Sequence, residues 1–344
     1  MFLSQIINTK SLTIKMAFEK KQDFLSKKII PFNPKNGGNV ESLLESLQNC
    51  GFQGRNLGRG LEVLYKMVTD ERILTVMTLS GAMIPAGMGE LICNLLEHKL
   101  IDVLISTGAN IIHDLVDAFS DIGHYVGSSE VDDEELFENR INRIYDVFLP
   151  EENYQKAENN ILRLIRDLFP KKEVDIPPSK LYYELGKKIT KRCILSVAAD
   201  KKIPIFTPAF SDSEFALNLI KYSAREGFSF HLDILKDVLN FADIIRQAKE
   251  YGTFIIGGGV PRNWAQQVFP LLDQLDKIET MGYNYSVRIH TGMEYDGGLS
   301  GCTISESKSW GKYSLDSKYV SIWCDATIAL PLLVTGLLQR LNLV

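Results

Sequence analysis

Short apolar runs rich in β-branched side chains recur along the chain, and small or polar residues follow almost every one. The runs cover residues 73–78, 101–105, 203–206, 253–256, 285–289 and 320–323. Uninterrupted apolar runs are typical of strands buried on both faces, as the strands of parallel sheets are. Helical patterns follow several of them, for example Met88 to Leu100 and Leu330 to Leu341. The alternation predicts an α/β fold, a Rossmann-like doubly wound, mostly parallel sheet with helices on both faces.

The residues that end these predicted strands are suited to ligand contact. They are Ser80-Gly81-Ala82, Ser106-Thr107-Gly108, Thr207-Pro208-Ala209, Gly257-Gly258-Gly259, His290-Thr291-Gly292 and Cys324-Asp325-Ala326-Thr327. In doubly wound sheets, ligands bind in the crevice beyond the carboxyl ends of the strands. We therefore expect the functional site along this edge.

The remaining segments predict the domain organisation. Residues 1–35 mix polar and apolar side chains, and we expect an N-terminal extension followed by a single domain over residues 36–344. Residues 130–190 have mostly helical sequence patterns. This predicts a helical insertion within that domain rather than a second domain. The acidic run at residues 130–135 is typical of a solvated helix start or loop.

The composition is that of an ordinary globular chain, with 344 residues, 45% of them apolar and 24% charged. A formal net charge of −5 and the lack of a concentrated Lys/Arg face argue against a nucleic-acid partner. The sequence has no apolar run long enough to cross a bilayer and no secretory signal pattern at its start. We therefore expect a cytoplasmic protein without a membrane partner.

The five cysteines and five histidines are scattered along the chain. There is no Cys-x-x-Cys pair and no histidine at metal-ligand spacing, so we expect a reducing compartment and no metal site. His113 lies beyond a predicted strand end and is a candidate substrate ligand. The alternative is a satisfied core histidine, which is the commoner role on an apolar stretch.

Lys312 is the best candidate for a nucleophile. It follows Trp310 and Gly311, and the acidic residue Glu306 stands shortly before them. An amine crowded by an indole and partly removed from water has its charged form disfavoured, so it becomes neutral and nucleophilic near physiological pH. The nearby carboxylates would hold an amine substrate. The alternative is an ordinary surface lysine after a turn.

Three glycines at residues 257–259 follow a predicted strand. Backbone N–H groups in such a turn approach a phosphate closely, and Pro261 suits the first turn of a following helix. The turn is not the G-x-G-x-x-G fingerprint, and alone it fits a tight turn equally well. The strand ends at Thr107 to Asn110 and Asp325 to Thr327 would add ribose and phosphate contacts, so together they favour a dinucleotide.

With these residues in place, the chain resembles the deoxyhypusine synthase family. Thr291 to Gly297, Ser300-Gly301, Glu306 and Ser309 to Lys312 look like that family's active-site block. The glycine turn at 257–259, Pro208-Ala209 with Asp212, and Asp325-Ala326 followed by residues 331–334 match in the same order. The resemblance covers residues 60 to 340, approximately.

The resemblance implies an NAD-dependent aminobutyl transfer. In that family NAD oxidises spermidine, the catalytic lysine forms an imine as diaminopropane leaves, and an acceptor amine takes the four-carbon unit. Lys312 matches the imine-forming lysine, Trp310 the wall beside the amine chain, and Glu306 an acid that binds the amine. Asp296 and Asn263 align with substrate-binding positions, although a turn and a helix cap are their plainer roles. The residues implied to contact NAD are Thr107, Gly108, Asp212, Gly257, Gly258, Thr291, Gly292, Asp325 and Ala326.

Several positions depart from the family pattern. Asn263 stands where the family has a histidine, so an imidazole that could shuttle protons is replaced by a neutral amide. Leu217 and Leu299 align with two aspartates that hold a terminal ammonium, and Ile112 with His113 replaces an acidic pair. Burying an ammonium without a partner costs several kcal/mol. A spermidine pose identical to the family's is therefore not expected unless Glu214 or another acid compensates.

Three functions remain open at this point. The first is a transferase acting on small amines, in the manner of a homospermidine synthase that uses putrescine or spermidine. The second is a deoxyhypusine synthase that modifies one lysine of a translation factor. The third is an NAD-binding relative without transfer activity, against which the intact Lys312 argues. The family's tetramers, with sites shared between subunits, imply a homo-oligomer.

Overall fold

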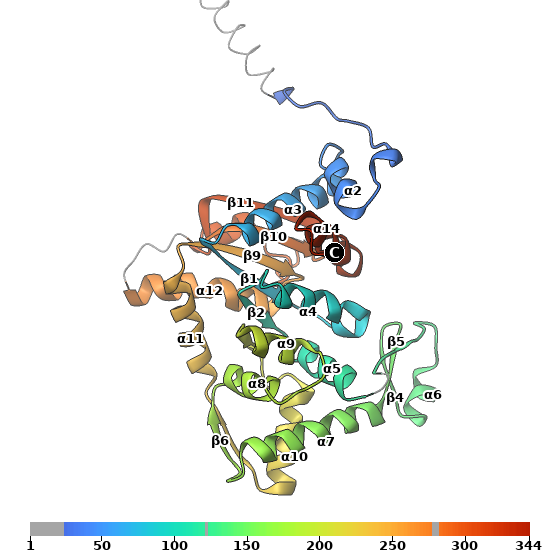
Figure 1. Ribbon diagram of the computed structural model, residues 1–344, viewed down its shortest axis with the longest axis vertical. Coiled ribbons are helices and arrows are strands. Elements are labelled where there is room, and N and C mark those ends of the chain that lie inside the picture. The colour runs from blue at the N-terminus through green and yellow to red at the C-terminus, as the bar shows by residue number, and fades with distance from the viewer. Residues whose placement is uncertain (1–23, 121–122, 277–281) are drawn as a thin grey trace, which may run out of the picture.

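A six-stranded parallel sheet forms the centre of the computed structural model, which describes residues 24–120, 123–276 and 282–344 (Figure 1). In chain order its strands are β1 (Ile73–Leu79), β2 (Val103–Ser106), β7 (Ile205–Phe206), β9 (Glu250–Ile256), β10 (Tyr283–His290) and β11 (Tyr313–Trp323). Each neighbouring pair is parallel. Every predicted apolar run overlaps one of these strands, so the predicted strands and their parallel arrangement are confirmed.

The order of strands across the sheet locates the site. It runs β11-β10-β9-β1-β2-β7. Counted from β7 in chain order, this is the 3-2-1-4-5-6 arrangement of a Rossmann sheet. The direction of chain progress reverses between β1 and β9, so the carboxyl ends of these two strands flank the switch point where such sheets bind ligands. The Rossmann-like prediction is confirmed.

Both faces of the sheet are covered by helices. The buried side chains of β1 therefore point alternately into a core on one face and a core on the other. Met77 and Leu79 belong to one hydrophobic core, while Val76 belongs to a second core on the opposite face. The helices of these layers are α3 (Phe52–Thr69) and α14 (Ala326–Arg340) on the first face, with α11 (Ile234–Gln247) and α12 (Gly259–Asp276) on the second. Successive side chains of a strand point to opposite faces, and here both faces are buried. This explains the uninterrupted apolar runs of the sequence.

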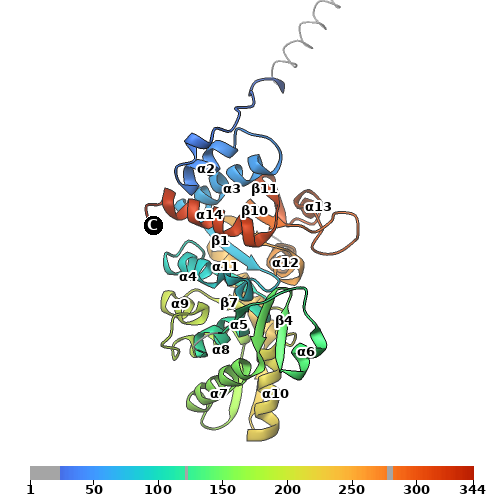
Figure 2. The same ribbon diagram turned by 90° about the vertical axis from the view of Figure 1, so that its right-hand side faces the viewer.

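A group of helices extends the molecule beyond the β7 edge of the sheet (Figures 1 and 2). It comprises α5 (Gly108–Phe119), α7 (Glu151–Leu168), α8 (Pro178–Gly186), α9 (Ile194–Lys201) and α10 (Glu214–Glu226), with α4 (Gly89–Glu97) and the short helix η2 (Ile84–Met88) beside the sheet. Two short strands, β6 (Glu173–Ile176) and β8 (Ser229–Leu232), pair in parallel next to these helices. In the described part of the chain, no helix is long and apolar enough to cross a membrane.

The insertion is only partly helical, so that prediction was incomplete. Besides α6 (Asp133–Glu138), α7 and α8, it contains β4 (Ile141–Ile144) and β5 (Val147–Pro150), which pair antiparallel with each other and with β3 (Tyr125–Val126). Tyr145 turns the β4–β5 hairpin with a φ of 55°. The sequence Ile-Asn-Arg-Ile does not alternate apolar and polar residues, so it carried no periodic signal of a strand. The acidic run behaves as predicted, because Asp132 caps the start of α6.

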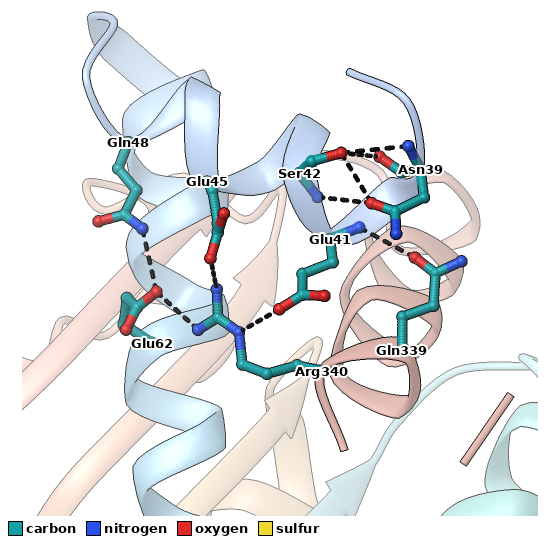
Figure 3. Close-up of polar contacts among 8 residues, drawn as sticks. All are labelled: Asn39, Glu41, Ser42, Glu45, Gln48, Glu62, Gln339 and Arg340. Carbon is teal, nitrogen blue, oxygen red and sulfur yellow. Dashed lines mark hydrogen bonds and ion pairs between the residues drawn. The ribbon is translucent and has the colours of Figure 1, made fainter. Parts of the chain in front are cut away.

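An arginine joins the two ends of the described chain. Arg340, at the end of α14, forms ion pairs with Glu41, Glu45 and Glu62 at 3.0, 2.9 and 2.6 Å (Figure 3). These acids belong to α2 (Val40–Leu47) and α3, which follow the short helix η1 (Pro34–Asn36). The Arg340 side chain is 11% exposed, and burial of its aliphatic stem adds to the charge contacts. The arginine therefore links α2 and α3 to α14.

Candidate active site

A cleft of about 270 Å³ opens at the predicted edge of the sheet, beside the switch point. Residues that follow β1, β2, β7 and β9 line it, together with one residue from the loop after β10. They are Ser80, Gly81, Ser106, Thr107, Gly108, Pro208, Ala209, Asp212, Gly259, Val260, Pro261 and Ser300. The carboxyl ends of four parallel strands lie together at this edge of the sheet. This explains why residues far apart in the sequence line one cleft.

Small residues are required on the walls of this cleft. A Cβ on Gly108 would lie 2.4 Å from the Cβ of Ser213, the residue that caps α10. Gly259 has a φ of 59°, a conformation that other residues adopt only with strain. Thr107 precedes α5 without capping it, because its hydroxyl donates to Gly81 O at 3.0 Å instead. The first N–H groups of α5 therefore lack a side-chain cap and suit an anion.

The structure brings together some of the predicted cofactor ligands and separates others. Thr107, Gly108 and Asp212 line the cleft. The turn at 257–258 supports it from behind, since Gly258 O accepts a hydrogen bond from Ser80 Oγ. The pairs Thr291-Gly292 and Asp325-Ala326 follow β10 and β11 at the same edge but lie outside this cleft. Asp325 caps α14 through Thr327 N at 2.8 Å.

Lys312 immediately precedes β11 and is half-buried. Its Nζ donates a hydrogen bond to Asn263 Oδ1 at 2.9 Å and lies 5.8 Å from the centre of the Trp310 ring. Asn263 lies in the first turns of α12, shortly after Gly259 to Pro261, which line the cleft. The start of α12 therefore connects the cleft to the amine.

The surroundings of Lys312 favour its neutral form. Burial lowers the pKa of this lysine below its usual range, and the charge of Arg262 acts in the same direction. Cys302 and Glu306 act in the opposite direction. The partner of the amine is a neutral amide, which accepts a hydrogen bond without adding negative charge. The sequence-based view of Lys312 as a partly desolvated amine is therefore consistent with its position.

The other predicted substrate ligands are more exposed. Trp310 is 66% exposed, and Glu306 lies on the surface of α13 (Ile304–Lys308). Asp296 is exposed and accepts a hydrogen bond from Gly298 N at 2.7 Å, which is the turn that its sequence context indicates. Trp310 and Glu306 belong to the segment that carries Lys312, whereas Asp296 has no contact with that segment among the hydrogen bonds of the described residues.

His113 does not face the cleft. Its Nδ1 lies 2.8 Å from His124 Nε2, and its Nε2 lies 3.2 Å from Tyr154 Oη. His124 in turn contacts Asp117 Oδ1 at 2.7 Å. Burial lowers the pKa of His113 to about 3, so the ring is neutral and both nitrogens are satisfied within the core. In the structure, His113 takes the alternative role of a core histidine.

Several lining residues and two buried arginines were not predicted from the sequence. Ser80 and Gly81 were recognised as a strand end, but only the strand order places them at the switch point. Arg262 and Arg288 are 2% and 1% exposed, and nothing in their sequence context distinguishes them from surface arginines. Within the described residues, no three or more His, Cys, Asp or Glu side chains are arranged to hold a metal ion.

Comparisons with known proteins agree on one family. The sequence profile described as "Deoxyhypusine synthase" matches residues 42–337. The chain is 35% identical to "Probable deoxyhypusine synthase 2" of Methanosarcina acetivorans over 322 residues, 92% of this chain and 91% of that protein. It is 37% identical to "Probable deoxyhypusine synthase 1" of Archaeoglobus fulgidus, covering 88% and 95%. The "Deoxyhypusine synthase-like protein" of Chlorobaculum tepidum is 34% identical over 86% of this chain and 85% of its own length.

The fold is also that of a solved structure. The crystal structure of an Entamoeba histolytica protein assigned as a deoxyhypusine synthase superimposes with a TM-score of 0.62. The superposition covers 90% of this chain and 96% of the other, at 20% sequence identity.

Proposed function

This chain belongs to the deoxyhypusine synthase family, whose members transfer aminobutyl groups, and from that premise we propose that it moves such a group from a polyamine through an imine on Lys312. The observation that carries the proposal is the half-buried Lys312 amine, hydrogen-bonded to a neutral amide and adjacent to Trp310. A binding protein without transfer activity has no need for such an amine.

The cleft residues fit part of an NAD molecule. The uncapped start of α5 and the glycines around it suit the phosphates, while the Asp212 carboxylate suits a ribose hydroxyl. A Cβ on Gly108 or Gly258 would meet Ser213 or Ser300 at under 3 Å, so these walls are shaped for close backbone approach. When bound, NAD would supply the hydride acceptor and donor that the oxidation of the donor amine and the final reduction require.

The residues of the chain supply the transfer itself. The Lys312 nitrogen, in its unprotonated form, adds to the oxidised carbon of the donor, and the donor's amine fragment leaves as the lysine imine forms. The acceptor amine then displaces Lys312, which is released as a free amine. Trp310 provides an aromatic surface for the chain of a cationic substrate. Glu306 provides a carboxylate on the same segment.

We further propose a small amine as the acceptor. Leu217 and Leu299 stand where the family resemblance leads us to expect aspartates, and both are exposed, at 47% and 44%. Glu214, the acid that could compensate, is already paired with Lys221 at 3.1 Å. These positions therefore offer no free carboxylate for a terminal ammonium, which favours a substrate that places its charges differently from the family pattern.

A second candidate is a deoxyhypusine synthase whose acceptor is a lysine of another protein. The names of the similar archaeal proteins favour it, since these relatives are called deoxyhypusine synthases. In this alternative the exposed Trp310 would lie at an entrance that a protein side chain reaches.

An acceptor assay distinguishes the two candidate functions. The purified protein would receive NAD and spermidine labelled in its aminobutyl part, with either putrescine or a translation-factor protein as acceptor. Label in homospermidine supports the small-amine acceptor, whereas label in the protein supports the second candidate. Lys312→Ala controls for transfer that bypasses the lysine, and absence of label from both acceptors would contradict both.

We also propose that the protein is a homo-oligomer with shared sites, most simply a tetramer. The cleft of about 270 Å³ is slightly smaller than the range of about 300 to 1,000 Å³ for small-molecule sites. Three of the predicted NAD-contacting pairs, Gly257-Gly258, Thr291-Gly292 and Asp325-Ala326, are not among its lining residues. A neighbouring subunit that completes the pocket would account for both observations.

A further inference from the structure

We propose that Arg262 is a positioning residue for Lys312, holding the segment that carries this lysine and adding a positive charge beside its buried amine. The inference rests on the proposed role of Lys312 and extends it to a residue that touches neither substrate nor cofactor in that account. It starts from two buried guanidinium groups whose hydrogen bonds go to neutral oxygen atoms.

Arg262 and Arg288 share one acceptor. Both donate from Nη1 to the carbonyl oxygen of Cys302, at 2.6 and 2.8 Å. Arg288 also donates to Gly257 O at 3.1 Å and to Ser300 O. The two guanidinium groups therefore hold the loop at residues 300–302 against α12 and β10.

Arg262 reaches further along the same segment. Its Nη2 donates to Ser307 Oγ at 3.3 Å, and the carbonyl of Ser307 accepts hydrogen bonds from the backbone N–H groups of Trp310 and Lys312 at 3.3 and 3.2 Å. The next residue of α12, Asn263, accepts the hydrogen bond from Lys312 Nζ. Consecutive residues of one helix thus hold the Lys312 segment by its backbone and by its amine.

In the part of the chain that the structure describes, the two arginines have no direct carboxylate partner, although Tyr313, Cys302 and Glu294 act on the charge of Arg288. Neither forms an ion pair with a carboxylate among the described residues, and Arg262 Nε, which is buried, has no hydrogen-bond partner there. Burial, and secondarily the charge of Arg262, lowers the pKa of Arg288 to about 10. Burying cations without a counter-charge is costly, and the charge of Arg262 acts on the Lys312 amine.

Lys312 is the titratable group on which this charge acts. The charged and titratable groups around it are Arg262 on α12, Cys302 in the loop and Glu306 on α13. Lys308 of α13 is directed to Leu315 O, and Asp316 of β11 is bonded to Ser314. Arg262 is therefore the neighbouring cation that opposes protonation of Lys312, while Cys302 and Glu306 favour it.

The test measures the amine directly, without NAD or a polyamine. The full chain would be incubated with butanal and cyanoborohydride over a range of pH. The lysine amine and the aldehyde form an imine with loss of water, and cyanoborohydride delivers hydride to give a stable butyl adduct. Mass spectrometry then gives the rate at Lys312 and, as an internal control, at Lys308 in the same segment.

Two substitutions separate charge from position. Arg262→Gln removes the charge, and we expect the pH midpoint of adduct formation at Lys312 to rise while that at Lys308 is unchanged. Arg262→Lys keeps the charge but cannot bridge Cys302 O and Ser307 Oγ in the same way. We expect it to keep the wild-type midpoint and to lower the plateau rate at Lys312.

An unchanged midpoint in Arg262→Gln would overturn the electrostatic role. If that variant does not fold, Arg262→Lys decides, because a wild-type plateau rate at Lys312 would overturn the positioning role. The reaction with the aldehyde requires neither NAD nor a polyamine. A negative result in this labelling test is therefore distinguishable from a lack of aminobutyl transfer in the acceptor assay.

Discussion

Lys312 is surrounded by groups that together decide its charge. The amine is half-buried, its hydrogen-bond partner is the neutral amide of Asn263, and Arg262 is the adjacent cation. Only the unprotonated amine attacks carbon, so aminobutyl transfer is expected to increase with pH. Because the pKa of Lys312 is lowered, the midpoint of this increase is expected below the ordinary lysine value of about 10.4.

Asn263→Asp tests this view of the amine. The substitution would place a carboxylate 2.9 Å from Lys312 Nζ and favour the ammonium form. We expect the pKa of Lys312 to rise, and the midpoint of the rate-pH profile to move upward by about 1 to 2 units. Asn263→Gln, which keeps a neutral amide, is the matched control. A profile that does not move in the aspartate variant would show that the amide does not set the protonation of the lysine.

The role of a residue was predictable only where its neighbours in the sequence indicated that role. The context of Lys312 indicated a desolvated amine, but the contact with Asn263 joins positions 49 apart in the sequence and depends on how α12 packs. Arg262 and Arg288 gave no signal, since burial of an arginine is decided by tertiary packing. For His113 the plainer alternative described the residue better, because its neighbours His124 and Tyr154 come from different segments.

The glycine at the start of α5 sets the distance between two elements of the cleft. Gly108→Ala would bring a Cβ to 2.4 Å from Ser213 Cβ, at the start of α10. We expect the two helix starts to move apart, with a loss of stability of about 1 to 3 kcal/mol. We also expect NAD to bind about tenfold more weakly, measured by titration calorimetry.

A glycine elsewhere in a helix provides the control. A Cβ on Gly54, in α3, would meet Leu47 at 3.4 Å, an ordinary contact. Gly54→Ala should therefore leave NAD binding unchanged and raise helix propensity. Equal NAD affinity in both variants would show that the approach of α5 to α10 does not shape the cleft.

Arg340 connects elements from both ends of the described chain. Arg340→Met would retain much of the apolar stem but leave Glu41, Glu45 and Glu62 without their shared cation. We expect the free energy of unfolding to fall by about 1 to 2 kcal/mol, measured by urea denaturation. Arg246→Met is the control, because that arginine is more exposed and is paired with Asp243 and Asp276. An equal loss in the two variants would contradict a special role for the Arg340 cluster.

At the scale of elements, periodicity predicted the central strands and failed in the insertion. The strands of the main sheet are buried on both faces, so their apolar runs stand out from the rest of the sequence. The hairpin of β4 and β5 is short and partly exposed, and neither strand has the apolar-polar alternation that would have indicated it in the sequence. Residues 1–23, in the predicted N-terminal extension, lie outside the described residues.

At the scale of the whole molecule, the order of strands in the sheet brings separate sequence motifs together at one site. The sequence predicted that small residues would meet at the carboxyl edge, and the order β11-β10-β9-β1-β2-β7 explains which of them do. Residues after β1, β2, β7 and β9 line the cleft with Ser300 from the loop after β10, whereas Thr291-Gly292 and Asp325-Ala326 lie outside it. The strand order itself could not be read from local patterns, because it depends on contacts between distant segments.

The shared-site proposal predicts that assembly and NAD binding are linked. Sedimentation at a series of protein concentrations should show a homo-oligomer, and the affinity for NAD should fall as dilution separates the subunits. A monomer that binds NAD with full affinity would contradict shared sites. It would leave the role of Lys312 untouched.

The most direct test of the central claim is to trap the transferred group on the enzyme. The protein would be incubated with NAD and spermidine, quenched with borohydride and analysed by peptide mass spectrometry, with Lys312→Ala alongside. Transfer through Lys312 predicts an aminobutyl adduct on this residue in the wild-type chain, and neither adduct nor transfer product in the variant. Product formation by Lys312→Ala, or an adduct on another residue, would contradict the proposed mechanism.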